Sequence, residues 1–187
     1  MRYIEKACVM DAARINRVIS RLASEIVERN RGVEGLVLAG IRRRGVPLAE
    51  RIADRIADLE GTRPNVTTLD ISFYDEELGT VGPMPVVRDF PVPDSLDQTT
   101  VVIVDDVLYT GRTILAAVWK LFEHGSPRRI QLAVLVDRGH REVPIQADYI
   151  GKIVPTKQGE IVKVMLVEQD GAEQVVIVEP ATAAEAT

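Results

Sequence analysis

The chain has 187 residues, enough for one domain with a sizeable hydrophobic core. Hydrophobic residues make up 46% and charged residues 27%, as in ordinary globular domains, and the net charge of −5 argues against unspecific nucleic-acid binding over the whole surface. No apolar run reaches the length of a membrane span, and the first ten residues do not form a signal peptide. The single Cys8 excludes an internal disulfide, suits a cytoplasmic protein, and is expected to be buried or half-buried.

The first predicted element is a helix over residues 11–30. Its apolar residues recur at helical spacing and form one face, comprising Ile15, Ile19, Leu22 and Ile26. Asp11 precedes them as the predicted N-cap. Three arginines, Arg14, Arg17 and Arg21, cluster on a separate face of the same helix.

A short strand over residues 35–40 follows, then a helix over 46–61 that ends at Gly61, the predicted C′ glycine. Residues 65–76 are rich in β-branched side chains and predict a strand. Residues 77–98 are rich in proline and glycine. A long irregular stretch within a compact domain is typical of a lid or binding loop, and the alternative is a disordered surface insertion.

The remaining predicted elements alternate again. Residues 99–106 predict a strand, 112–125 a helix closed by Gly125, and 129–139 a buried strand. Residues 163–169 and 174–180 predict a late antiparallel pair. Alternating strands and helices indicate an α/β domain with a mainly parallel sheet covered on both faces. We expect one domain over residues 1–179 and a frayed tail over 180–187.

The stretch "VVIVDDVLYTGRT", Val101 to Thr113, carries the clearest chemistry. Ligands bind at the carboxyl ends of strands in such sheets, and adjacent carboxylates there can accept hydrogen bonds from two ribose hydroxyls. The small residues that follow open a helix, where backbone N–H groups can surround a phosphate. The alternatives for the carboxylates are a Mg²⁺ site or a turn cap. The pattern matches neither the P-loop nor GxGxxG.

This stretch resembles the phosphoribosyl-pyrophosphate (PRPP) motif of type I phosphoribosyltransferases. The resemblance extends through "SRLASEIVERN", "GIRRRGVPLAERIADRI", "LDISFYDEEL" and "IQLAVLVDRGHREVPIQADYIGK" to the bifunctional pyrimidine-operon attenuation regulators that also have uracil phosphoribosyltransferase activity. It implies the type I fold, in which helices flank a central, mainly parallel sheet that carries a small hood and a flexible lid loop. It also implies a homo-oligomer.

The reaction that the resemblance implies is the displacement of pyrophosphate from PRPP by uracil, giving UMP. Mg²⁺ would arrive with PRPP, with no direct protein ligand. One alternative is a uracil phosphoribosyltransferase of pyrimidine salvage without an RNA role. Another is a type I enzyme for orotate or a purine, which the block "DRGHREVPIQADYIGK" disfavours.

The resemblance also implies the residues of the catalytic site. The catalytic residues would be Asp105, Asp106, Asp137 and Arg138. PRPP would contact Ile41, Arg42, Arg43 and Arg44 in a pyrophosphate loop, and Val104, Asp105, Asp106, Val107, Leu108, Tyr109, Thr110, Gly111, Arg112 and Thr113 in the motif. The base would lie near Asp137, Arg138 and His140. The lid would supply Ser72, Tyr74 and Arg88.

A non-proline cis peptide is expected in "GIRRRG", although its arginines could also form a solvated basic run. In the lid, Asp75 stands where relatives carry an arginine, so either activity is reduced or Arg88 substitutes.

An RNA-binding surface is the last implied feature. Residues 1–60 carry more Lys and Arg than Asp and Glu, whereas the remainder is acidic. Relatives bind a stem-loop of pyrimidine leader mRNA when UMP occupies the active site, and the residues expected to bind RNA here are Arg14, Arg17, Ser20, Arg21, Ser24, Arg141 and Lys152. Ser20, Ser24 and Ile153 depart from the family pattern. The alternative is a solvated helix face.

Overall fold

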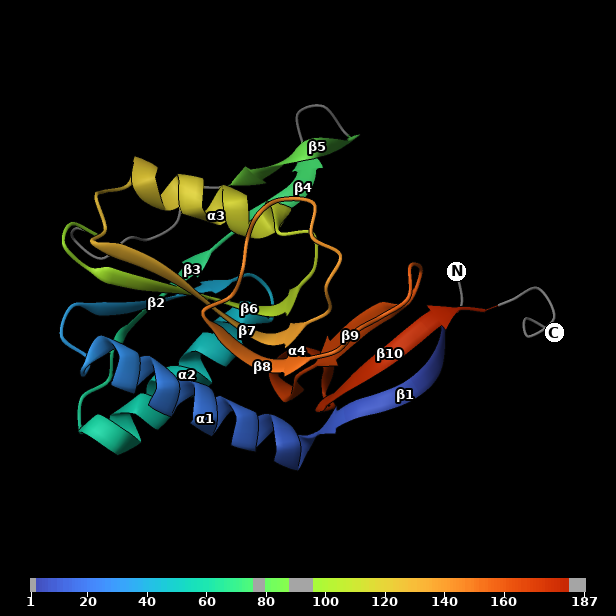
Figure 1. The fold of residues 1–187 in the computed structure, drawn as a ribbon, viewed down its shortest axis with the longest axis horizontal. Helices are drawn as coiled ribbons and strands as arrows, with labels where there is room; N and C mark the ends of the chain where they lie inside the picture. Colours follow the sequence, from blue (N-terminus) through green and yellow to red (C-terminus); the bar gives the residue numbers. More distant parts are fainter. Residues whose placement is uncertain (1–2, 76–79, 88–95, 182–187) are drawn as a thin grey trace.

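The structure is a computed structural model that describes residues 3–75, 80–87 and 96–181. Its centre is a five-stranded sheet in the order β3-β2-β6-β7-β8, and every neighbouring pair is parallel (Figure 1). The strands are β2 (Leu36–Ile41), β3 (Asn65–Leu69), β6 (Thr100–Leu108), β7 (Arg129–Asp137) and β8 (Tyr149–Ile153). The predicted parallel α/β architecture is confirmed, although β8 was not among the predicted strands.

Helices α1 (Ala12–Asn30) and α2 (Gly45–Glu60) cover one face of this sheet, and α3 (Arg112–Glu123) covers the other (Figure 1). The Asp11 side chain accepts a hydrogen bond from the Arg14 N–H at 2.7 Å, which confirms the predicted N-cap of α1. Gly61 caps α2 with a φ of 71°. Helix α3 ends at Glu123, before the predicted Gly125, because His124 leaves the helical conformation.

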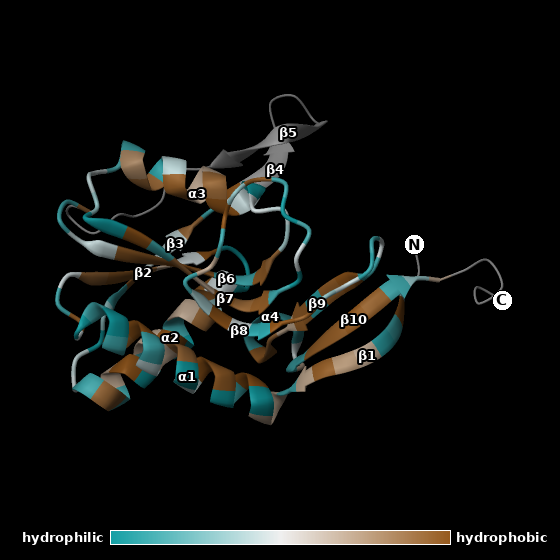
Figure 2. Ribbon diagram, in the orientation of Figure 1, coloured by the Kyte–Doolittle hydropathy of each residue, from teal (hydrophilic) through white to brown (hydrophobic). Residues whose placement is uncertain are grey.

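The hydrophobic core lies in two layers, one on each side of the sheet. The α1–α2 layer contains the predicted apolar face of α1, and the α3 layer packs on the opposite side. Figure 2 shows hydrophobic residues along the central strands and hydrophilic residues along the outer side of α1. The residues that periodicity assigned to the α1 core face, Ile15, Ile19, Leu22 and Ile26, are all buried.

A second, smaller sheet lies beside the main one and corresponds to the expected hood. It is antiparallel, in the order β1 (Tyr3–Asp11), β10 (Gln174–Pro180) and β9 (Ile161–Met165). The late antiparallel pair is confirmed, but residues Val167–Asp170 form the short helix α4 and do not continue the strand. Strand β1 was not predicted, because most of its residues are exposed. Cys8 lies on it and is exposed, so its expected burial was wrong.

The expected lid region forms a hairpin next to α3 (Figure 1). Strands β4 (Ile71–Asp75) and β5 (Thr80–Val87) pair antiparallel. The single strand predicted over 65–76 is therefore interrupted at Asp70, and the stretch 77–98 is not irregular throughout. Over the described ranges, no helix is long and apolar enough to cross a membrane.

Candidate active site

The chain connections place the predicted site at one edge of the main sheet. From the adjacent strands β2 and β6, the connections through α2 and α3 lead to strands on opposite sides, β3 and β7. A reversal of this kind opens a crevice at the carboxyl ends of the strands. The loops after β2, β6 and β7 therefore meet there, and these are the three segments that carry the predicted pyrophosphate, ribose and base residues.

Asp105 and Asp106 lie near the carboxyl end of β6. The strand runs two residues further than predicted, because β7 still pairs with it at Val107 and Leu108, whereas the pairing with β2 ends at Val104. The N–H of Asp106 donates to Asp105 Oδ1 at 2.9 Å, and the N–H of Val107 donates to Asp106 Oδ1 at 3.0 Å. The two side chains are thus fixed by the backbone.

Both carboxyl groups lie in an environment that disfavours their charged form. Burial, together with the neighbouring Asp106, raises the pKa of Asp105 well above its usual value. Burial also raises the pKa of Asp106, against the opposing effect of the Arg44 guanidinium. Donors or positive charge beside this pair would relieve the repulsion, as ribose hydroxyls and a developing oxocarbenium ion would.

The arginine loop packs directly against β6. A Cβ at Gly45 would lie 2.3 Å from the Val104 carbonyl oxygen, and a Cβ at Gly40 would lie 2.6 Å from Val46 Cα. Only glycine therefore permits this close approach of loop and strand. The peptide bond between Arg42 and Arg43 is cis, as expected for this loop.

The three arginines of this loop have different surroundings. Arg42 pairs with Asp70 at 2.9 Å. Arg44 binds Asp170 of α4 with two hydrogen bonds. Arg43 is exposed and makes no ion pair with any residue that the structure describes. The loop therefore carries one exposed arginine between two whose guanidinium groups are held by aspartates.

The predicted phosphate segment forms the loop that leads into α3. Gly111 is the N-cap residue, with a φ of 88°, and a Cβ there would lie 2.8 Å from Val143 Cγ2. The Thr110 hydroxyl accepts from the Arg112 N–H at 3.4 Å, and the Thr110 carbonyl accepts from the Glu142 N–H at 3.0 Å. Thr113 follows in the first turn. The loop is thus attached to the segment after β7.

The segment after β7 surrounds the predicted base region. Arg138 is 7% exposed and donates to Thr156 Oγ1 at 3.2 Å and to the Glu160 carbonyl oxygen. Its guanidinium lies 4.2 Å from the centre of the Tyr109 ring. His140 contacts the Thr156 carbonyl oxygen at 2.7 Å. Arg138 is thereby held between the hood and the PRPP motif.

A cavity of about 380 Å³ opens at this segment. It is lined by Asp137, Arg138, Gly139, His140, Arg141, Ile153, Pro155 and Thr156. Asp137 and Arg141 form an ion pair within it at 2.5 Å. Arg141 also donates to the Tyr109 and Ile145 carbonyl oxygens. The side chain of Arg141 therefore links several segments that surround the cavity.

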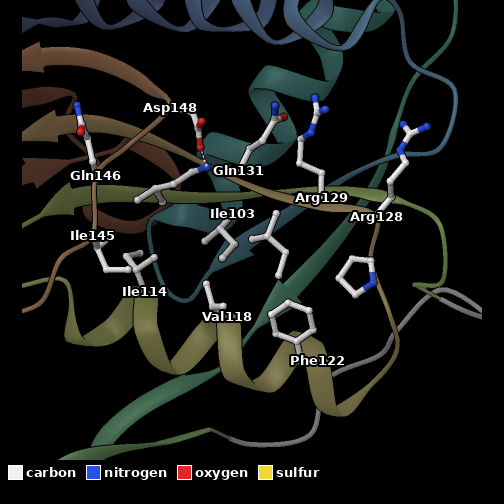
Figure 3. Close-up of a pocket in the computed structure, with 13 residues that line it drawn as sticks. Ile103, Ile114, Val118, Phe122, Arg128, Arg129, Gln131, Ile145, Gln146 and Asp148 are labelled. Atoms are coloured by element: carbon white, nitrogen blue, oxygen red, sulfur yellow. Dashed lines mark hydrogen bonds between the residues drawn. The ribbon is translucent and has the colours of Figure 1, made fainter.

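A second cavity of about 380 Å³ lies between α3 and the amino-terminal part of β7 (Figure 3). Its floor is apolar and includes Ile103, Ile114, Val118 and Phe122. Figure 3 shows Gln131 pointing away from these side chains. The cavity contains none of the predicted site residues, so the chemistry is not placed there.

The predicted RNA residues differ in whether their side chains bond to other parts of the chain. Arg14 and Arg17 are exposed on the outer side of α1. Arg21 is also on α1, but it pairs with Glu25 and donates to the Ile150 and Gly151 carbonyl oxygens of β8 at 3.0 and 2.7 Å.

Three other predicted RNA residues donate to main-chain oxygens, and the last, Arg141, pairs with Asp137 at the cavity described above. Ser20 and Ser24 donate to carbonyls one helical turn earlier on α1, at 3.1 Å each. Lys152 donates to the Val9 carbonyl oxygen at 3.1 Å. Arg14 and Arg17 are therefore the more accessible cations of the predicted surface.

Only some of the residues predicted for the lid are among those that the structure describes. Ser72 and Tyr74 belong to β4, and Asp75 is its last residue. Arg88 lies outside the described residues. Within those residues, no group of three His, Cys, Asp or Glu side chains is placed to hold a metal ion.

Sequence reasoning missed the residues that hold the predicted site in place. Asp70 and Asp170 bind two of the loop arginines, and Thr156 and Glu160 bind Arg138. These partners are far apart in the sequence and belong to no motif. A pattern search therefore has no signal for them.

Comparison with known proteins agrees with this arrangement. The phosphoribosyl transferase domain model matches residues 9–169. Among solved structures, the hypoxanthine phosphoribosyltransferases of Trypanosoma cruzi and Staphylococcus aureus superpose with TM-scores of 0.76 and 0.72, each at 20% identity. The first covers 97% of this chain and 95% of its own, and the second 94% of both. At this identity they show the fold alone, and they confirm the type I architecture.

Curated relatives are much more similar in sequence. The bifunctional protein PyrR of Pelotomaculum thermopropionicum is 56% identical over 95% of this chain and 98% of the relative. The protein of that name from Chloroflexus aurantiacus is 55% identical over 90% of this chain and 93% of the relative. The chain therefore belongs to the phosphoribosyl transferase domain family and, within it, to the bifunctional PyrR proteins.

Proposed function

We propose that this chain transfers the phosphoribosyl group of PRPP to uracil, giving UMP and pyrophosphate. The observation that carries the proposal is the adjacent pair of buried Asp105 and half-buried Asp106 at the carboxyl edge of the sheet, between the arginine loop and the start of α3. In the reaction, the bond from ribose C1′ to pyrophosphate breaks and a bond from C1′ to uracil N1 forms. The N1 proton of uracil is released.

Different residues at this edge of the sheet would bind different parts of PRPP. Asp105 and Asp106 accept hydrogen bonds from the ribose hydroxyls and stabilise the positive charge that develops on the sugar. The backbone N–H groups at the start of α3, with the hydroxyls of Thr110 and Thr113, bind the 5′-phosphate. The arginine loop would bind pyrophosphate, with Arg43 supplying an exposed guanidinium.

Mg²⁺ would enter with PRPP as part of the substrate. Mg²⁺ keeps several waters and binds substrate phosphates together with few protein carboxylates. The uracil ring would occupy the cavity beside Arg138 and His140, where Tyr109 lies within contact of both.

The activity is tested by incubating the purified chain with PRPP and Mg²⁺ and each of uracil, orotate and hypoxanthine, and measuring kcat/KM for every base. We expect a high value for uracil alone. The double variant Asp105→Asn/Asp106→Asn is the negative control. A higher kcat/KM for orotate or hypoxanthine would overturn the assignment of the base.

The second proposed activity is UMP-dependent binding of pyrimidine leader mRNA, which would attenuate transcription of the operon. It is supported by membership in the bifunctional PyrR proteins and by the exposed Arg14 and Arg17 on α1. The alternative, a salvage enzyme without an RNA role, is disfavoured by this membership. UMP strengthens RNA binding only if it binds the RNA-competent form better, and RNA then strengthens UMP binding by the same factor.

Residues 1–179 would form one domain that works in the cytoplasm, where its proposed substrates and mRNA are found. A homo-oligomer would join the α1 faces of several copies into a larger basic surface. Gel filtration with light scattering tests the assembly, and a mass of about 20.6 kDa, that of one chain, would contradict it.

A further inference from the structure

Arg44, the last arginine of the pyrophosphate loop, is bound by the hood. Its Nε donates to Asp170 Oδ2 at 3.1 Å and its Nη2 donates to Asp170 Oδ1 at 2.7 Å. The pair is partly sheltered, with side-chain exposures of 30% and 18%. Two parallel hydrogen bonds fix the orientation of a guanidinium as well as its position.

Asp170 is itself held by the main chain of the hood. Its Oδ2 accepts from the Leu166 N–H at 3.0 Å, and its own N–H donates to the Leu166 carbonyl oxygen at 2.7 Å. Gly171 then closes α4 with a φ of 67°. The carboxylate therefore presents a fixed acceptor pair to the pyrophosphate loop.

The other neighbour of Arg44 is the ribose site. The negative charge of Asp106 acts on the Arg44 guanidinium, so Arg44 interacts with a proposed catalytic carboxylate as well as with the hood carboxylate that binds it. Because the bonds to Asp170 use Nε and Nη2, Nη1 makes no hydrogen bond to the residues that the structure describes. That end of the guanidinium is available to a substrate oxygen.

We propose that Asp170 is a positioning residue for the transfer reaction: it holds Arg44 beside Asp106 before PRPP binds, with Nη1 directed at the pyrophosphate group. The inference rests on the proposed function, since it assumes that PRPP binds at this edge. Without Asp170, the Arg44 side chain would lose its fixed orientation, and PRPP would have to order it at a cost in rotamer entropy.

The hood supplies a matched control. Glu173 pairs with Arg51 of α2 at 2.6 Å, and its side chain is 11% exposed. Like Asp170, Glu173 is a sheltered hood carboxylate that binds an arginine. Its partner Arg51 lies within α2, however, and not in the pyrophosphate loop. A purely structural role of these hood ion pairs would make the two carboxylates equivalent.

The test is isothermal titration calorimetry of Mg²⁺–PRPP binding to wild type, Asp170→Asn and Glu173→Gln, followed by KM for PRPP and for uracil and kcat. We expect Asp170→Asn to weaken PRPP binding and raise its KM about tenfold, with KM for uracil and kcat changed little. Glu173→Gln should leave PRPP binding unchanged. Should Asp170→Asn fail to fold, Arg44→Lys, which keeps the charge but cannot make the two-bond pair, should give the same loss.

The outcomes separate the two proposals. Equal PRPP affinity in Asp170→Asn and wild type, or equal losses in Asp170→Asn and Glu173→Gln, would overturn the positioning role while leaving the transfer reaction standing. A fall in kcat without a rise in KM for PRPP would also overturn it. A wild-type chain that does not bind PRPP would overturn the proposed function itself.

Discussion

The catalytic edge and the outer side of α1 are built in different ways. At the edge, the functional groups are fixed before any ligand arrives: Asp105 is 9% exposed, Arg138 is 7% exposed, and Arg44 is bound by Asp170. On α1, Arg14 and Arg17 are exposed on the side opposite the core. Among the three arginines predicted to bind RNA on this helix, Arg21 is the one that donates hydrogen bonds to another described element, strand β8.

This difference matches the demands of the two proposed activities. Phosphoribosyl transfer requires charges that are already oriented at the reacting carbon, because reorienting them would add to the barrier. RNA binding through phosphates depends on accessible positive charge and is weakened by salt. The edge should therefore respond strongly to small changes, and α1 should respond mainly through charge.

The largest expected effect concerns the ribose site. Asp105→Asn/Asp106→Asn should lower kcat/KM for UMP formation by about 10²–10³-fold or more, because the developing positive charge loses both carboxylates. Initial rates with PRPP and uracil measure it. Circular dichroism should show an unchanged fold, and retained turnover would contradict the assignment of the ribose site.

The close approach of the arginine loop to β6 should also be sensitive. Gly45→Ala would place a methyl group 2.3 Å from the Val104 carbonyl oxygen, so loop and strand must separate. We expect a loss of about 1–3 kcal/mol in the free energy of unfolding, with a rise in KM for PRPP. Gly61→Ala, where no atom lies within 4 Å of the new Cβ, should also lose stability because of its φ of 71°, but it lies far along α2 from the loop and should spare KM.

The α1 surface is tested by charge removal. Arg14→Gln/Arg17→Gln should weaken binding of leader RNA and reduce the slope of log K against log salt by about one to two units, while catalysis is unchanged. Filter binding at several salt concentrations measures this. Arg21→Gln should in addition lower thermal stability, since it removes two hydrogen bonds to β8. Unchanged RNA affinity in the double variant would mean that this helix face is only solvated.

The smallest expected effect is on stability. Because the pKa of Asp105 is raised in the folded chain, the folded state holds this proton where the unfolded state has released it. Stability from this group is therefore present below the ordinary aspartate pKa and is lost as pH rises through the raised value. Asp105→Asn should raise Tm at neutral pH by about 2–4 °C for each kcal/mol gained, and less at pH 4. An equal Tm change at both pH values would contradict this.

Much of the fold followed from local patterns. The core face of α1, its Asp11 cap and the Gly61 cap of α2 depend on neighbouring residues, so periodicity and capping rules identified them. Strands β1 and β8 were not predicted, because their residues are only partly buried and show no clear alternation of buried and exposed side chains.

The site was predictable only in part, for a related reason. Its motifs are continuous stretches of sequence, whereas its supports are not. Asp170 is 126 residues from Arg44, and Glu160 is 22 residues from Arg138. Such pairs depend on how the hood packs against the main sheet. A sequence pattern that spans only a few residues carries no information about them.

The central claim is that one nucleotide site serves both catalysis and RNA control. The most direct test is to measure binding of the purified chain to its own pyrimidine leader RNA, with and without UMP. The account predicts specific binding that UMP strengthens and salt weakens. Absence of specific binding, or binding indifferent to UMP, would contradict it and leave a phosphoribosyltransferase alone.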